Sequence, residues 1–256
     1  MKNFKKRIPF FKGAYSNKTK SYLDLENLTN VLTGKSWDYT NDPESEVPDD
    51  YIGNITRDSN LNFLESKKAA LRAKKAGEND LYKQLKNSQS LYFTQSSTFK
   101  RGKNNAAGDE ITFEPLPFVV IDIDSKTPEE LETATKNFKR DENSFLVNHS
   151  SSGKGLHVYY AVNWDKKQIN HTEFRERYLL LAKRLTLKYN DYFVDVSMAN
   201  SVQPNYVTPH NLYKNYSCKG FTFNEEELNF LNSSNDYRND YFKYLGSQKG
   251  LRGATK

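Results

Sequence analysis

FVVIDIDSK, residues 118–126, joins an apolar run to two closely spaced aspartates. The run from Phe118 to Ile121 predicts a buried β-strand. Because side chains alternate across a strand, Asp122 and Asp124 leave it on one face, roughly 7 Å apart along the chain. Carboxylates held so close repel each other unless a cation lies between them, so the pair favours a divalent metal site. Alternatively, Asp124 begins a turn or caps the next helix, and Asp122 is merely exposed.

A loop of small residues follows the next predicted strand. It reads HSSSGKGLH, residues 149–157, and its two glycines allow a ligand to approach the backbone closely. Amide, hydroxyl and cationic groups of this kind suit the oxygens of a triphosphate. The loop is not a Walker A motif, because Gly155 follows Gly153-Lys154 where that motif has Ser or Thr. A hairpin loop with solvated polar side chains is the alternative reading.

A third aspartate lies in the later segment YFVDVS, between Val194 and Val196. Asp195 in such an apolar run needs a cation or a hydrogen-bond donor, unless it sits at a sheet edge facing water. Three strand-borne aspartates and a phosphate-type loop together favour a site for metal and nucleotide.

Helices and strands alternate through the second half of the chain, which predicts an α+β fold with a sheet covered by helices. In one predicted helix Thr127 is the N-cap, Pro128 the first residue, and Glu130 completes a capping box. Helices are expected at 21–34, 60–77, 80–87, 127–140, 171–190 and 224–232, and strands at 118–124, 144–149, 156–162 and 192–196. The expected divisions are an N-terminal helix and acidic loop (1–58), a catalytic core (59–220), and a C-terminal helical extension with a basic tail (221–256).

The composition describes a polar, aromatic-rich chain of 256 residues with a formal net charge of +6. That charge suits a polyanionic partner without proving one. One cysteine, Cys218, leaves no pair for an intramolecular disulfide and no Cys/His grouping for structural zinc, and it fits a reducing compartment. The apolar part of the N-terminal stretch is too short for a signal peptide, and no run reaches transmembrane length. We therefore expect a soluble cytoplasmic protein that does not bind membranes.

The segment from Lys67 to Lys103 is basic, with ten Lys or Arg residues against two acidic ones. It suits the backbone of a template or primer, with Tyr82, Tyr92 and Phe93 available to stack on bases. The alternative is a solvated helix face plus core aromatics. The candidate nucleic-acid contacts are Lys83, Lys86, Lys100, Arg101 and Lys103.

The order of the motifs VVIDID, SSGKGLH and FVDVS resembles the archaeo-eukaryotic primase, or primase-polymerase, superfamily. Residues 70–99 and 195–215 also resemble its VirE N-terminal-like branch, found in bacterial mobile elements and phages. The resemblance covers roughly residues 60–220.

The resemblance implies a primase-polymerase catalytic fold, in which an N-terminal α/β unit packs on an RRM-like sheet and the active site lies in the cleft between them. It implies a DNA primase or DNA-directed polymerase, a nucleotidyltransferase acting in replication of a mobile element or phage. The catalytic residues would be Asp122, Asp124 and Asp195, which would hold two Mg²⁺ or Mn²⁺ ions. The nucleotide-binding residues would be Ser152, Gly153, Lys154, Gly155 and His157. The partners would be single-stranded or primer-template DNA, nucleoside triphosphates and a separate helicase.

Two positions depart from the branch, because Gln203 stands where it has an arginine and His210 where it has an acid. Loss of an arginine that contacts phosphate would weaken nucleotide binding. The departures favour a rival reading, a catalytically weak primase-like module that binds nucleic acid. A metal-dependent nuclease using the same carboxylates is a further alternative. A haloacid-dehalogenase-type phosphatase ranks lower, because Lys126 stands where that family expects Thr or Val.

Overall fold

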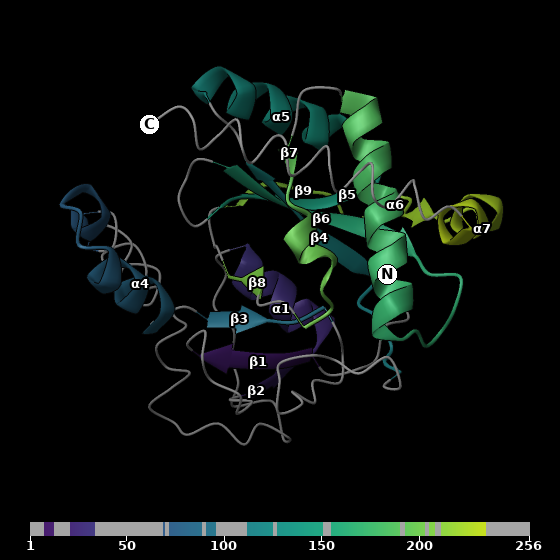
Figure 1. Ribbon diagram of the computed structural model, residues 1–256, viewed down its shortest axis with the longest axis horizontal. Coiled ribbons are helices and arrows are strands. Elements are labelled where there is room, and N and C mark those ends of the chain that lie inside the picture. Colours follow the sequence, from purple (N-terminus) through teal and green to yellow (C-terminus); the bar gives the residue numbers. More distant parts are fainter. Residues whose placement is uncertain are drawn as a thin grey trace.

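The fold is α+β, with two separate sheets and helices packed around them (Figure 1), and the strands pair antiparallel except for β10, which pairs parallel with β6. It was obtained as a computed structural model. The structure describes residues 8–12, 21–33, 69, 72–88, 91–95, 112–124, 127–150, 155–189, 193–202, 205–207 and 211–233.

The larger sheet has six strands and is built around the motif strand of the sequence. Its order is β7-β4-β6-β5-β9, and β10 pairs with the far end of β6. In chain order the central elements are strand, helix, strand, strand, helix, strand, which is the split βαβ arrangement. The elements are β4 (Phe118–Asp124), α5 (Pro128–Arg140), β5 (Ser144–His149), β6 (Gly155–Asn163), α6 (His171–Tyr189), β7 (Phe193–Val194), β9 (Asn211–Lys214) and β10 (Phe221–Thr222).

Local signals explain where the central elements begin. β4 is buried along its apolar run and reaches solvent only at its two aspartates. The Thr127 side chain accepts from the amide of Glu130, and the Glu130 carboxylate accepts from the amide of Thr127, so the predicted capping box is confirmed. The predicted α6 is also confirmed, ending at Tyr189.

The smaller sheet comes mostly from the N-terminal part of the chain, and its strand order is β2-β1-β3-β8. Its elements are β1 (Ile8–Lys12), β2 (Ser21–Leu23), β3 (Leu91–Phe93) and β8 (Asn205–Tyr206), and α1 (Leu25–Leu32) follows β2. The helix expected from residue 21 begins only at Leu25, because Asp24 is its N-cap and accepts from the amide of Asn27 at 2.7 Å. The sequence did not predict β1, β8 or β9. The loop expected at 37–58 lies outside the described residues.

The two sheets pack face to face, with α5 and α6 on the other side of the larger sheet. The ring of Phe93 in β3 lies 6.3 Å from that of Phe118 and 6.5 Å from that of Tyr159. The next residue along β6, Tyr160, points the opposite way, and its hydroxyl contacts Asp141 at the end of α5. Figure 1 shows the resulting layers, with α5 above the larger sheet and β1 to β3 below it. One face of β4 therefore meets the N-terminal sheet, and the other meets the helices.

Three short helices complete the fold, and one of them, η3, packs on α6 and β4 with Met198 and Ala199 buried. The three are α4 (Asn79–Ser88), the 3₁₀ helix η3 (Val196–Ala199) and α7 (Glu225–Ser233). Figure 1 shows α4 standing apart from both sheets. None of the described helices is both long enough and apolar enough to cross a membrane.

Candidate functional site

The strand register brings the first and second motifs together. Asp122 of β4 is directly opposite His157 of β6, and the Asp122 Oδ1 atom lies 3.8 Å from His157 Nε2. Only 10% of the His157 side chain and 25% of the Asp122 side chain are exposed. The predicted carboxylate and the predicted imidazole therefore share one half-buried position on the sheet.

The third motif joins them from the other side of β4. Ile123 pairs with Val194, so the antiparallel register places Asp195 opposite Asp122. The amide of Asp195 donates to the carbonyl oxygen of Asp122 at 2.9 Å, which extends the pairing by one residue. Residues opposite each other in such a ladder have Cβ atoms about 5 Å apart. Asp195, Asp122 and His157 thus form one row across three strands.

Asp124 and the small-residue loop occupy the next position along β4. Asp124 is exposed and pairs with Gly155. A Cβ atom on Gly155 would lie 2.3 Å from the carbonyl oxygen of Ile123, so only glycine fits this close approach of the two strands. The amide of Ser150 donates to the carbonyl oxygen of Gly155 at 2.8 Å and closes the hairpin between β5 and β6. Three predicted nucleotide-binding residues, Ser152, Gly153 and Lys154, lie outside the described residues.

Two asparagines continue the row, and the sequence reasoning missed both. Asn148 of β5 is opposite His157, and Asn211 of β9 is opposite Asn148. The Asn148 side chain is fully buried. The sequence feature that could have identified Asn148 is an amide side chain inside the apolar strand SFLVNH, since a buried amide requires hydrogen-bond partners.

Helix α6 supports the carboxylate row from the opposite face of the sheet. The Tyr178 hydroxyl lies 3.2 Å from the carbonyl oxygen of Val120 and 3.3 Å from that of Asp195. Tyr178 is fully buried. The hydroxyl therefore touches both strands that carry the first and third motifs, and it helps to keep Asp195 beside β4.

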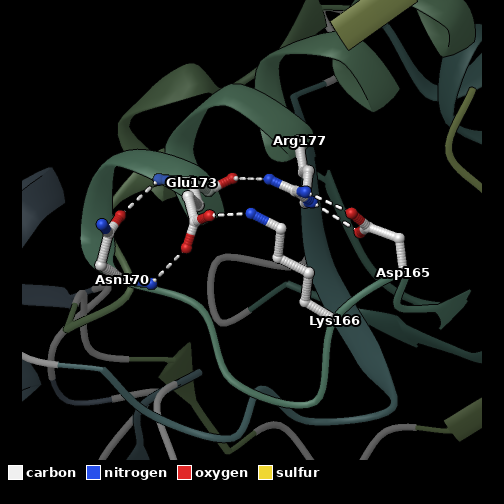
Figure 2. A network of polar contacts seen from close by, with 5 residues as sticks. All are labelled: Asp165, Lys166, Asn170, Glu173 and Arg177. Carbon is white, nitrogen blue, oxygen red and sulfur yellow. Dashed lines mark hydrogen bonds and ion pairs between the residues drawn. The ribbon is translucent and has the colours of Figure 1, made fainter. Parts of the chain in front are cut away.

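A polar network fixes the beginning of α6 (Figure 2). The Asn170 side chain accepts from the amide of Glu173 at 2.8 Å, and the Glu173 carboxylate accepts from the amide of Asn170 at 2.9 Å. Lys166 also pairs with Glu173. The buried Arg177 holds Asp165 with two hydrogen bonds, from Nε at 2.8 Å and from Nη2. The network ties the loop after β6 to the helix that carries Tyr178.

The charges of this network shift the pKa values of its acids. Hydrogen bonding to Arg177 lowers the pKa of Asp165 below its ordinary value. Burial alone would raise the pKa of Glu173, but the hydrogen bonds from Lys166 and from the amide of Asn170 outweigh it and lower that pKa. Both carboxylates are therefore ionised partners of cations at neutral pH.

The carboxylates offer the donor set of a hard divalent cation. Asp122, Asp124 and Asp195 supply oxygen ligands only, and such ligands suit Mg²⁺ or Mn²⁺. The backbone register gathers them at one end of β4. Within the described ranges, no three His, Cys, Asp or Glu side chains are gathered as a metal-binding group. The donor chemistry and the strand register suit such an ion.

The predicted nucleic-acid contacts fall partly on α4. The Lys83 side chain is 69% exposed, with its Nζ atom 4.0 Å from Asp80, and Lys86 belongs to the same helix. Lys74 lies over the ring of Tyr82 at 5.3 Å from its centroid. Lys100, Arg101 and Lys103 lie outside the described residues, as do Gln203 and His210.

The prediction that Tyr92 and Phe93 stack on bases is wrong. Both side chains are buried, with 1% and 0% of their surface exposed, and the Phe93 ring packs between the two sheets against Phe118 and Tyr159. Tyr82 is half-buried, so of the three aromatics it alone retains exposed surface.

Comparison with known proteins gives one match. Residues 84–197 match the model of the family described as BT4734-like, N-terminal domain. The matched region is a little under half of the chain, and it contains Asp122, Asp124, His157 and Asp195. No match was found among curated proteins or among solved structures.

Proposed function

We propose that this protein catalyses metal-dependent, template-directed nucleotidyl transfer, as a DNA primase or DNA polymerase. The observation that carries the proposal is the row of Asp195, Asp122 and His157 on three neighbouring strands, with Asp124 and its partner Gly155 beside it. Three sequence motifs that lie far apart in the chain meet at one end of one sheet. The split βαβ topology and the N-terminal sheet packed on it also support the primase-polymerase reading.

We assign metal binding and charge stabilisation to the carboxylates. Asp122, Asp124 and Asp195 would hold two divalent cations, which when bound stabilise negative charge on the attacking and leaving oxygens. Asp195 is oriented by its own amide bond to β4 and by Tyr178 beneath it. Asp122 is half-buried, so its charge acts in a less screened environment than that of an exposed carboxylate.

We assign binding of the triphosphate to the hairpin between β5 and β6. Gly155 brings the loop within van der Waals contact of β4, so a phosphate held by the loop would lie next to the carboxylates. His157 Nε2 faces the same position and can donate a hydrogen bond to a phosphate oxygen. Ser152, Gly153 and Lys154 complete the proposed nucleotide-binding set.

The nucleic acid is assigned to the basic segment that includes α4, where exposed cations such as Lys83 would contact phosphates. The partners are single-stranded or primer-template DNA and nucleoside triphosphates, and a separate helicase would supply any unwinding. The biological setting that we propose is replication of a mobile element or phage in the cytoplasm.

The test is incorporation of labelled nucleotides on primed and unprimed single-stranded DNA, with Mg²⁺ or Mn²⁺. Wild type is compared with Asp122→Asn and with Glu132→Gln, an exposed carboxylate on α5 at the opposite face of the sheet. We expect metal-dependent extension by wild type and Glu132→Gln, and a loss of at least about 100-fold in Asp122→Asn, as for removal of a main charge-stabilising group. Product on unprimed template would identify a primase.

A second candidate is a nucleic-acid-binding module with little or no catalysis. The observation that favours it is α4, which stands apart from both sheets in Figure 1 and carries the exposed Lys83. Intact DNA binding by all three proteins, with no incorporation by any of them, would reject the enzyme and leave this module. Degradation of labelled DNA without added nucleotides would instead indicate a nuclease.

A further inference from the structure

We propose that Asn148 is a positioning residue, which couples helix α1 of the N-terminal layer to the strand that carries His157. The inference rests on the proposed function insofar as it assigns His157 to the triphosphate. Its structural content, a coupling between α1 and β6, can be measured without any catalysis.

The hydrogen bonds of Asn148 connect three distant segments of the chain. Its Nδ2 atom donates to the carbonyl oxygen of Leu32 at 2.9 Å. Its Oδ1 atom accepts from Asn211 Nδ2 at 2.9 Å. Because Asn211 donates to Oδ1, the orientation of the Asn148 amide is determined, and its NH₂ group faces α1. The side chain is fully buried, so water does not compete for these bonds.

The partner on α1 is a carbonyl group at the C-terminal end of a helix, where the last carbonyls have no partner within the helix. Thr33 satisfies part of this end, because its amide and hydroxyl both donate to the carbonyl oxygen of Thr29. Leu32 is the last residue of α1, and Asn148 reaches its carbonyl from the larger sheet. This bond fixes the distance between the end of α1 and the larger sheet.

The same residue contacts the proposed site through the strand register. Asn148 and His157 are opposite each other in β5 and β6, so their side chains lie on one face, with Cβ atoms about 5 Å apart. A shift of α1 would therefore act through Asn148 on the strand position opposite His157. An apolar residue would fill a site that only needed packing, whereas an amide with two directed bonds specifies one arrangement of the two layers.

The control asparagine lies at the other end of β6. Asn163 also bridges to a distant segment, because its Nδ2 atom donates to the carbonyl oxygens of Lys219 at 3.2 Å and Gly220 at 2.9 Å. It is exposed and has no contact with the Asp122 row in the register. The variants are Asn148→Leu, which keeps the branched shape and the number of side-chain heavy atoms but removes both bonds, and Asn163→Leu.

Two measurements are made on the full chain: native-state amide hydrogen exchange, and titration with a fluorescent dATP analogue in the presence of Mg²⁺. In Asn148→Leu we expect at least about tenfold faster exchange both in α1 and at residues 156–158, and about tenfold weaker binding of the analogue. In Asn163→Leu we expect both readouts to match those of wild type near the row. Faster exchange in α1 alone, with unchanged binding, would overturn the coupling.

Two further outcomes keep the proposal decidable. If Asn148→Leu does not fold, Asn211→Leu replaces it. This variant keeps the bond from Asn148 to Leu32 but removes the bond that orients the Asn148 amide, together with the bond from Asn211 to the carbonyl oxygen of Tyr213 within β9. We then expect amide hydrogen exchange to become faster both in α1 and at residues 156–158, by less than in Asn148→Leu. Faster exchange confined to β9 would reject the proposal. If wild type binds no analogue, the proposed function fails, while the exchange data still decide whether Asn148 couples the two layers.

Discussion

The amide of Asp195 donates a hydrogen bond to the carbonyl oxygen of Asp122 at 2.9 Å, and so joins the ends of two strands that carry separate sequence motifs. β7 itself has only two residues, and this bond carries its pairing one residue further. The consequence is electrostatic, because it places one carboxylate opposite another, with Asp124 two residues along. Like charges at this spacing destabilise the folded chain until a cation joins them.

Removing one of these charges should therefore stabilise the metal-free protein while abolishing its response to metal. We expect Asp122→Asn to unfold at the same temperature as wild type or higher in EDTA. In Mn²⁺ at about 100 times its dissociation constant, wild type should gain roughly 2.7 kcal/mol, and its Tm should rise by several degrees. The check is thermal unfolding in both buffers, with Glu132→Gln as the control. An equal rise in Asp122→Asn would contradict the metal assignment.

A second prediction concerns Gly155 and the contact between β6 and β4. A Cβ atom there would meet the backbone oxygen of Ile123 at 2.3 Å, and neither strand can move without disturbing the central pairing. We expect Gly155→Ala to lower the free energy of unfolding by about 1–3 kcal/mol, as for overpacking in a core. Urea denaturation measures the loss. In Gly77→Ala the new Cβ atom meets open space, so that variant shows only the cost of its positive φ of 78°.

The buried carboxylate of Asp141 makes a third prediction. It accepts hydrogen bonds from the hydroxyls of Tyr160 at 3.1 Å and Tyr189 at 2.5 Å, and from Lys188 at 3.1 Å. Burial, and then the negative charge of Asp141, raise the pKa of Tyr160, so its hydroxyl stays protonated and donates. We expect Asp141→Ala to lower the free energy of unfolding by about 3 kcal/mol, because several bonds to one charge are lost.

Denaturant unfolding of Asp141→Ala beside Glu132→Ala separates this effect from surface charge. Glu132 pairs with Lys136 on the exposed side of α5, where both side chains are more than half exposed. Its removal should leave the denaturation midpoint unchanged. If the two variants lost equal stability, the Asp141 cluster would be no more than a surface ion pair.

The parts of the fold that the sequence predicted are those with local signals. β4 has its apolar run and α5 has its capping box, and each of these signals lies within a few consecutive residues. β1, β8 and β9 were missed, because short strands are defined by partners far away in the chain. Their sequences carry no turn or periodicity that distinguishes them from loops.

The candidate site was likewise predicted only in part, through its local signals. Asp122, Asp124, His157 and Asp195 were singled out as residue types in ordered motifs, but their row depends on register, which only long-range pairing determines. Asn148 was not singled out as a candidate site residue. Its bond to Leu32 could not be foreseen, because nothing near either residue in the chain indicates the other.

The pairing of Asp165 with Arg177 predicts acid sensitivity. Hydrogen bonding to Arg177 lowers the pKa of Asp165 in the folded protein. A depressed pKa stabilises the fold above the ordinary carboxyl value, and this stabilisation is lost as the pH falls through the folded value. We expect Asp165→Asn to have a lower urea midpoint than wild type at about pH 6. The difference should shrink as the pH falls below about 4, where the carboxyl of unfolded wild type becomes protonated, and should vanish once the folded carboxyl is protonated too. A difference that did not depend on pH would show that shape, not charge, matters there.

Lys83 tests the nucleic-acid surface independently of catalysis. Its side chain is 69% exposed on α4, and Asp80 lies 4.0 Å away, too weak a pair to neutralise it. If Lys83 contacts a phosphate of single-stranded DNA, Lys83→Ala should weaken binding at low salt and reduce the slope of log K against log salt by about 0.7. Fluorescence anisotropy over a range of salt concentrations gives both quantities.

The matched control for Lys83 is Lys136→Ala, which removes an equally exposed lysine from α5. Both variants lower the net charge by one unit, so a general effect of charge would weaken DNA binding equally in the two proteins. A contact at α4 instead predicts that Lys83→Ala alone changes the slope. Equal slopes in wild type and Lys83→Ala would remove Lys83 from the interface and would direct attention to Lys86 and the basic residues that follow it.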